Sequence, residues 1–375
     1  MVSLLEEVDK RRDTILRLFQ KLHEIPEKGM QEYKTSAFIK ELLSKSNKFD
    51  ELIQVGETGL IGIIKGEEEG PVMGIRTDID GLEFDIDGEK VMKHACGHDA
   101  NMTMAISAAL IAAEQGIKKG TLKLILQPAE ETLNGAKLML DSGYMDDIDE
   151  LYGMHLRPIQ EAKLGQAIPA LRHAASAVLY ATIHGEAGHG ARPHLAINSI
   201  EAGVNIVNAI NAIHMNPAVS HSVKVTKFIS GGTATNIIPD RCEMTVDLRA
   251  QTNEEMKGLL EKTKRAIIKG AETIGARAEI VEGGSVPAAE YDDELIKVTK
   301  KAIEKVLGSS MDELLTPGGE DFHYYSTEGK LKTAYVGLGA DLTPGLHSLD
   351  MQFNTDALYN GVKIFLEIID SRLNQ

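Results

Sequence analysis

The residues best suited to chemistry lie in one short stretch, His94-Ala95-Cys96-Gly97-His98-Asp99, the only place where a cysteine and two histidines crowd together. A thiolate, an imidazole and a carboxylate are ligands that transition metals such as zinc prefer. A lone buried cysteine more often packs in a core, but these neighbours favour a metal site. A cysteine nucleophile with His98 or His155 as its base is an alternative.

Three later stretches offer ligands of the same kinds: Gln127-Pro128-Ala129-Glu130-Glu131, Tyr152-Gly153-Met154-His155 and Gly345-Leu346-His347. Adjacent glutamates usually lie on the surface, and a single histidine is more often structural. Here the glutamates follow an apolar run, so one can bind metal while the other moves protons. We expect the four stretches to meet at one dinuclear metal centre.

Hydrophobic patterns predict the elements that position these residues. We expect helices over 3–24, 31–45, 100–115 and 134–141, and buried strands over 59–64, 72–76, 121–127 and 151–155. The alternation predicts an α/β fold with a doubly wound sheet, in which ligands gather at the carboxyl ends of the strands. The candidate ligands up to His155 all follow or end a strand, and so do the acidic residues Asp78 and Asp80.

The pattern changes after about residue 175 and changes back near 284. Residues 177–183, 222–229 and 242–248 alternate like half-exposed strands, with helices expected at 195–214 and 253–275. Helices on one face of an antiparallel sheet make a separate α+β domain. A helix at 291–307, a strand at 333–338 and a helix at 355–373 then resume the first pattern. We therefore expect a catalytic domain of residues 1–175 and 284–375, with residues 176–283 inserted into it.

Composition narrows the class of protein. The chain has 375 residues, 43% of them hydrophobic, and a formal net charge of −16, which argues against a nucleic-acid partner. Its two cysteines, Cys96 and Cys242, are too few for a disulfide framework. Residues 1–24 lack the apolar core of a signal peptide, and no run approaches the roughly 20 apolar residues needed to span a bilayer. We expect a cytoplasmic protein without a membrane partner.

The sequence resembles the amidohydrolase branch of the metal-dependent aminoacylase/carboxypeptidase family, which includes hippurate hydrolases, indole-acetyl-amino-acid hydrolases and N-acetyldiaminopimelate deacetylases. The similarity covers nearly the whole chain. The matching stretches are 22–27, 76–80, 94–99, 127–131, 153–158, 188–194, 231–239 and 319–322, followed by His347. So many matches in the same order make chance a poor explanation.

The resemblance implies a site with two divalent ions bridged by Cys96, zinc or manganese being expected and cobalt or nickel being alternatives. It implies that His98 and His155 complete the coordination of one ion, and that Glu131 and His347 complete the coordination of the other. Glu130 would be the general base and then the general acid. Either Asp78 or Asp99 could orient His98 as an outer partner.

The inserted domain of this family is ferredoxin-like and serves as a dimerisation and lid domain. The resemblance implies that His189 polarises the scissile carbonyl or stabilises the oxyanion, within its own subunit or across a homodimer. Asn236 and Arg249 are candidates for the substrate carboxylate, although Arg249 could equally form a structural salt bridge.

These implications predict an enzyme that hydrolyses the amide bond of an N-acyl amino acid, a small-molecule substrate. A dipeptidase or aminocarboxypeptidase would use the same site with a different acyl pocket. A metal-dependent binding protein without turnover is a third possibility, and the presence of Glu130 counts against it, because no structural metal site requires such a residue.

Overall fold

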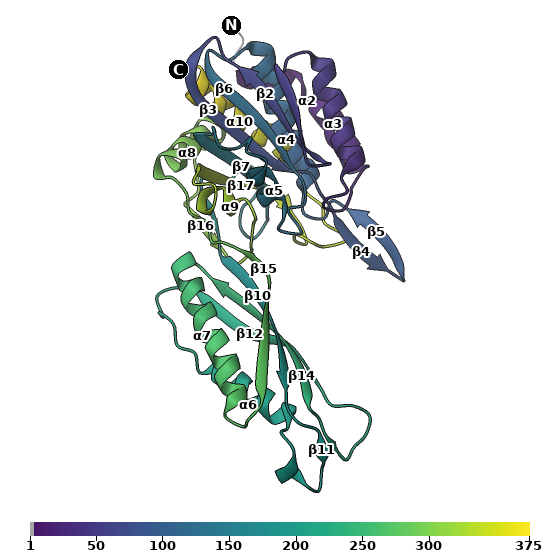
Figure 1. Ribbon diagram of the computed structural model, residues 1–375. Helices are drawn as coiled ribbons and strands as arrows, with labels where there is room; N and C mark the ends of the chain where they lie inside the picture. The colour runs from purple at the N-terminus through teal and green to yellow at the C-terminus, as the bar shows by residue number, and fades with distance from the viewer. Residues whose placement is uncertain (1–3) are drawn as a thin grey trace. The chain divides into compact units, whose positions relative to one another are not determined.

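A computed structural model describes residues 4–375 of the chain (Figure 1). The chain divides into two compact units. The first runs to Arg172 and continues through Glu290–Leu314 and Asp321–Gln375, and the second, inserted unit comprises His173–Ala289 and Leu315–Glu320. Within the described residues, no helix is both long enough and apolar enough to cross a membrane.

The first unit is built on a seven-stranded mixed sheet with the order β1-β2-β6-β3-β7-β17-β8. The central strands β6, β3, β7 and β17 are parallel to one another, whereas the pairings β1–β2, β2–β6 and β17–β8 towards the edges are antiparallel. The mixed α/β sheet expected from the sequence is confirmed. The strands are β1 (Glu51–Val55), β2 (Gly59–Lys65), β3 (Glu68–Asp78), β6 (Lys119–Gln127), β7 (Glu150–Pro158), β8 (Ala167–Ile168) and β17 (Lys332–Leu342).

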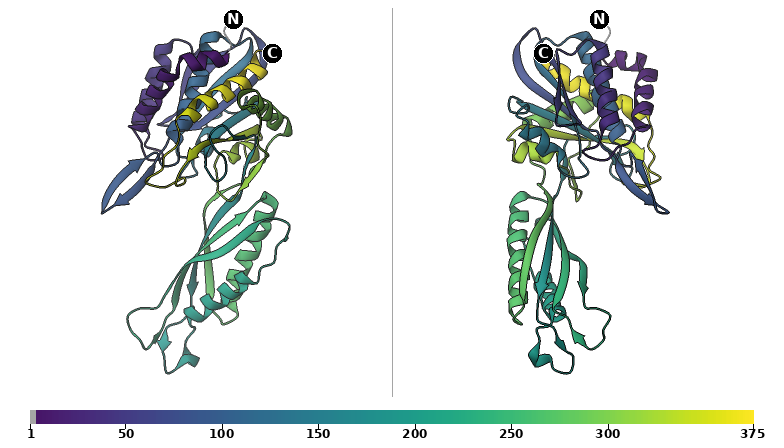
Figure 2. Two further views of the ribbon diagram at one scale, coloured as in Figure 1. Left: turned by 180° about the vertical axis from the view of Figure 1, so that it is seen from behind. Right: turned by 45° about the vertical axis from the view of Figure 1, so that its right-hand side comes forward.

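Helices cover both faces of this sheet. On one face α4 (His98–Gln115) and α10 (Asp356–Leu373) pack side by side, and α10 is the yellow helix over the sheet in the rear view of Figure 2. At Gly361 of α10 an added Cβ would lie 2.0 Å from Met104 Sδ of α4, so a larger residue there would force the Met104 side chain to move. The remaining helices of the unit are α1 (Leu4–Lys10), α2 (Arg12–His23), α3 (Tyr33–Ser46), α5 (Gly135–Asp141), α8 (Asp293–Leu307) and α9 (His323–Thr327).

The N-terminal helix differs from the single helix expected over 3–24. Residue 3 lies outside the described residues, and the helix is interrupted at Arg11, where φ is −106° and ψ is 11°. The guanidinium of Arg11 forms an ion pair with Glu114 of α4 at 2.6 Å. A hairpin of β4 (Leu82–Ile86) and β5 (Glu89–Lys93) was also not expected, and half of the residues in its two strands are charged.

The inserted unit is a four-stranded antiparallel sheet with the order β12-β14-β10-β15. Its buried residues form a core of their own, which α6 (Ser199–Asn211) and α7 (Asn253–Glu272) cover. The alternation predicted three strands, and the fourth was missed because β15 is an exposed edge strand interrupted by Gly283-Gly284. The strands are β10 (Ala175–His184), β12 (His221–Ser230), β14 (Arg241–Ala250) and β15 (Arg277–Val286).

Short elements complete the chain. They are β9 (Leu171–His173), β11 (Gly188–His189), the 3-10 helix η1 (Pro193–Leu195), β13 (Ile237–Ile238) and β16 (Leu314–Thr316), with β11 pairing with β13 and β9 with β16.

A buried arginine ties the parallel strands together beneath their carboxyl ends. The Arg76 guanidinium on β3 donates to Asp78 at 2.9 Å, to Asp321 at 2.8 Å and to Gln127 at the end of β6 at 2.8 Å. Its side chain is 1% exposed, so these contacts are made out of water, where charge-assisted hydrogen bonds are strong. The network fixes the strand ends from which the candidate ligands project.

Candidate metal centre

The fold carries the candidate ligands to one edge of the first unit's sheet. Cys96 and His98 flank Gly97, whose φ of 88° lies in the left-handed region that favours glycine, and α4 begins directly at His98. The glutamate pair follows the end of β6, and His155 lies on β7, two strands away, three residues before the last residue of that strand. Since β6, β3, β7 and β17 are parallel, their carboxyl ends meet at the same edge.

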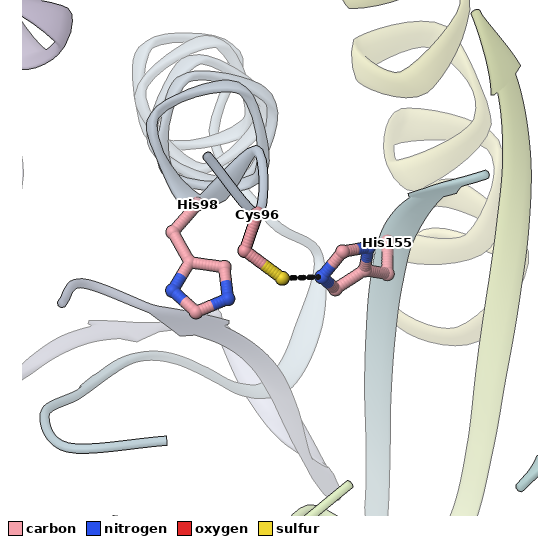
Figure 3. Close-up of side chains that lie close together, drawn as sticks. All are labelled: Cys96, His98 and His155. Atoms are coloured by element: carbon pink, nitrogen blue, oxygen red, sulfur yellow. Dashed lines mark hydrogen bonds between the residues drawn. The ribbon is translucent and has the colours of Figure 1, made fainter. Parts of the chain in front are cut away.

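The candidate ligands form two triads that share one sulfur. The ligand atoms of Cys96, His98 and His155 all lie within 4.8 Å of one another, and those of Cys96, Glu131 and His347 do the same. Cys96 Sγ lies 3.5 Å from His155 Nε2, with the His98 ring on its other side (Figure 3). The structure thus brings all five predicted ligands together, with Cys96 placed where a bridging ligand belongs.

Burial and donor chemistry fit metal ions at these triads. His98 Nε2 is buried and makes no hydrogen bond, although Asp78, Glu130 and Glu131 each place a carboxylate oxygen 3.8 to 3.9 Å away. A buried polar atom without a partner is costly, and an ion would supply that partner. Sulfur, imidazole nitrogen and carboxylate oxygen together suit zinc.

The charges of the cluster are interdependent. Burial and the Glu131 carboxylate oppose ionisation of Cys96, but the His98 and His155 imidazoles outweigh them and lower the pKa of the thiol to about 6. Hydrogen bonds to Cys96 and Glu131 raise the pKa of His347 to about 10. The cluster therefore favours a Cys96 thiolate, whose charge protonated histidines or bound divalent ions would balance.

The outer partners of the two buried histidines turn their Nε2 atoms towards Cys96. His98 Nδ1 donates to Asp80, whose Oδ1 lies at 3.1 Å and whose carbonyl oxygen lies at 3.0 Å. His155 Nδ1 donates to the carbonyl oxygen of Leu156 at 2.8 Å. Such contacts fix the tautomer and ring orientation of a metal-binding histidine.

The expectation that Asp78 or Asp99 orients His98 is corrected by these contacts. Asp99 instead accepts a hydrogen bond from His23 Nδ1 at 2.6 Å. The carboxylate of Asp78 is engaged by Arg76 and by the Asn101 amide at 3.1 Å. Sequence reasoning missed Asp80, although this residue belongs to the acidic stretch at the end of β3 that had drawn attention.

His347 reaches the site from the loop after β17 with a less usual backbone. Its φ is 63°, in the left-handed region, whereas the sequence suggested that Gly345 would make the turn. The His347 amide donates to the carbonyl oxygen of Ala95 at 2.7 Å, which ties this loop to the Cys96 loop. Its side chain is 56% exposed and its Nε2 lies 3.4 Å from Glu131 Oε1, so this ligand is the most accessible of the five.

Two of the three candidates in the inserted unit lie together. β11 pairs with β13 so that His189 faces Ile237, next to Asn236. His189 Nδ1 accepts a hydrogen bond from the Ala191 amide at 3.0 Å, so the neutral ring carries its proton on Nε2, where it can serve as a donor.

Arg249 lies elsewhere in the inserted unit. It lies near the far end of β14, eight residues and roughly 26 Å along the strand from Arg241, the first residue of β14. Its guanidinium forms two hydrogen bonds with Asp247, at 3.2 and 3.0 Å. This geometry favours the structural salt bridge over a role in binding the substrate.

The fold and the site together define a class of two-domain metallohydrolase with paired ion sites. The chain belongs to peptidase family M20/M25/M40, whose sequence profile matches residues 74–371. The family resemblance noted in the sequence is thereby confirmed.

Relatives with described activities match over most of their length. An N-acetylcysteine deacetylase of Bacillus subtilis is 28% identical, covering 94% of this chain and 95% of the relative. The IAA-amino acid hydrolase ILR1-like 2 of Arabidopsis thaliana is 32% identical, covering 94% and 83%. Among solved structures, a Bacillus subtilis protein described as a dinuclear metal binding peptidase of the M20 family has a TM-score of 0.82 at 27% identity, covering 97% of this chain and 99% of that one.

The contact between Asp80 and His98 yields a prediction. The Asp80 carboxylate accepts one hydrogen bond from His98 Nδ1 and another, at 3.0 Å, from the Glu131 amide. In Asp80→Asn the single amide oxygen cannot accept both. We expect metal affinity to fall by about 10- to 100-fold, as for other outer partners of metal-binding histidines. Titration against a chromophoric chelator measures this, with Asp99→Asn as the matched control. Equal affinities for both variants would contradict the assignment.

Proposed function

We propose that this chain is a dinuclear metal amidohydrolase that cleaves an N-acyl amino acid into a carboxylate and a free amino acid. The observation that carries the proposal is the Cys96 sulfur shared by two ligand triads, with Glu130 beside them. The deacetylase and amino acid hydrolase relatives, and the dinuclear peptidase with the same fold, support it. Two divalent ions are proposed as cofactors. Zinc or manganese is the expected metal, and cobalt or nickel is the alternative.

Amide hydrolysis needs an activated water, a stabilised oxyanion and a protonated leaving group. Bound divalent ions lower the pKa of water and polarise the carbonyl. Glu130 belongs to neither triad that includes Cys96, but its carboxylate lies within 4.8 Å of the ligand atoms of His98 and Glu131, with its Oε2 3.9 Å from His98 Nε2. The carboxylate of Glu130 can therefore accept a proton from the attacking water and return it to the departing amine. Glu130 is only 7% exposed, so bulk water has little access to these proton transfers.

The inserted unit is proposed to supply substrate contacts. The Nε2 proton of His189 is a suitable donor to the oxygen of the scissile carbonyl, worth roughly 3 kcal/mol in the transition state by analogy with other oxyanion donors. Asn236 next to it is the preferred candidate for the substrate carboxylate, since Arg249 is engaged by Asp247. Whether His189 acts in its own subunit or across a homodimer, and the cytoplasmic location, stay predictions.

The role of Glu130 can be separated from metal binding. Glu130→Gln removes only the proton acceptor, so we expect metal content to be unchanged and kcat to fall by about 100- to 10,000-fold. Glu131→Gln is the matched control, because it alters the adjacent residue of the same turn, and it should lose metal. Metal analysis and steady-state kinetics on both variants test this. A Glu130→Gln enzyme with full turnover would remove the assigned role.

A substrate panel tests the function itself. We expect N-acetyl, N-benzoyl or indole-acetyl amino acids to be cleaved with higher kcat/KM than dipeptides, and cleavage to stop in chelated protein and return with metal. Preference for dipeptides would favour the dipeptidase alternative. Normal rates in metal-free protein would favour the cysteine nucleophile, and binding without turnover would identify a binding protein.

A further inference from the structure

The turn that carries Glu130 is anchored by two carboxylates from distant parts of the first unit. The Ala129 amide, just before Glu130, donates to Glu32 Oε1 at 2.8 Å. The Glu131 amide, just after it, donates to Asp80 Oδ2 at 3.0 Å. Glu130 is thus held between two fixed amides, and a carboxylate acceptor makes each of these hydrogen bonds stronger than a neutral one.

The first of these anchors acts on a strained residue. Ala129 has a φ of 55°, in the left-handed region that is unfavourable for a residue with a Cβ. Such a conformation persists only where the surroundings impose it. The segment containing Glu32 packs directly on this turn, since a Cβ added to Gly29 would lie 3.0 Å from Ala129 Cα.

The burial of the Glu32 carboxylate costs free energy. Its side chain is completely buried, its Oε1 also accepts from the Met30 amide at 3.1 Å, and its Oε2 accepts from the Thr58 hydroxyl at 2.7 Å. Among the described residues its partners are amides and a hydroxyl, with no cation within ion-pair distance. Burying a carboxylate without a cation costs free energy, and the hydrogen bonds that Glu32 accepts offset this cost.

We propose that Glu32 is a positioning residue for Glu130. Its carboxylate holds the Ala129 peptide in the left-handed conformation, and this aims the Glu130 side chain at the centre occupied by Cys96 and His98. The inference rests on the proposed role of Glu130 as the proton carrier. Glu32 contacts neither the ligand set nor the reacting atoms, so its effect on catalysis passes through the turn.

The test compares variants that remove or keep the acceptor facing Ala129. Glu32→Met has a similar volume and no acceptor, and we expect kcat to fall about 10- to 100-fold, the scale of a misplaced catalytic group, with KM and metal content unchanged. Glu32→Gln keeps one oxygen for the amides and should restore kcat to near the wild-type value. Thr58→Val, the matched control, removes the other contact of Glu32 and should leave kcat unchanged.

A double-mutant cycle distinguishes positioning from general structure. Adding Glu32→Met to Glu130→Gln should lower the residual turnover by less than about twofold, because the group being positioned is already gone. A further loss as large as in the wild type, metal loss, or a change confined to KM would overturn the proposal. If Glu32→Met does not fold, Glu32→Asp, which keeps the charge but shortens the reach, takes its place with the same expectations.

Failure of this inference is distinguishable from failure of the proposed function. If the wild type hydrolyses N-acyl amino acids and Glu130→Gln abolishes turnover, the function stands, and full kcat in Glu32→Met then contradicts only the positioning role. If Glu130→Gln is fully active, the role of Glu130 falls first.

Discussion

The site depends on the charge of one buried sulfur. Cys96 lies among the imidazoles of His98 and His155 on one side and the Glu131–His347 pair on the other. A thiolate and several carboxylates in a pocket removed from water repel one another unless positive charge is placed among them. Protons on the histidines can supply this charge, and divalent ions held by these groups would supply more of it.

The fold meets this requirement by convergence of strand ends. Four parallel strands end at one edge of the sheet, so segments about 250 residues apart in the sequence contribute to one cluster of ligand atoms. Buried polar contacts then fix each contribution: Arg76 joins the ends of β3 and β6, Asp80 orients His98, and the Ala95 carbonyl holds His347. Precise placement thus comes from groups that do not themselves belong to the ligand triads.

The central strands and the candidate ligands could be predicted from residue types and periodicity. The apolar runs before Glu130 and within the strand that holds His155 mark buried strands, and ligands at strand ends follow from the rules of parallel sheets. The five ligand types are chemically distinctive, which is why they could be singled out from sequence. The strand β15 carried too weak a signal, because its glycines and exposed face hide the alternation.

The residues that sequence reasoning missed act through hydrogen bonds whose direction no periodicity encodes. Asp80 and Asp99 are both aspartates near His98, and only the folded geometry shows that one contacts His98 and the other His23. Glu32 lies at the start of the helix expected over 31–45, where a charged residue is usually exposed, and it is buried because the neighbouring Gly29 packs against a turn far along the chain. Tertiary contacts of this kind have no local signature.

The most direct measurement of the central claim is anomalous diffraction at the metal absorption edge from crystals of the metal-loaded protein. The account predicts two anomalous peaks about 3.5–4 Å apart, with Cys96 Sγ between them, His98 and His155 at one, and Glu131 and His347 at the other. A single peak, or peaks that Cys96 does not contact, would contradict it.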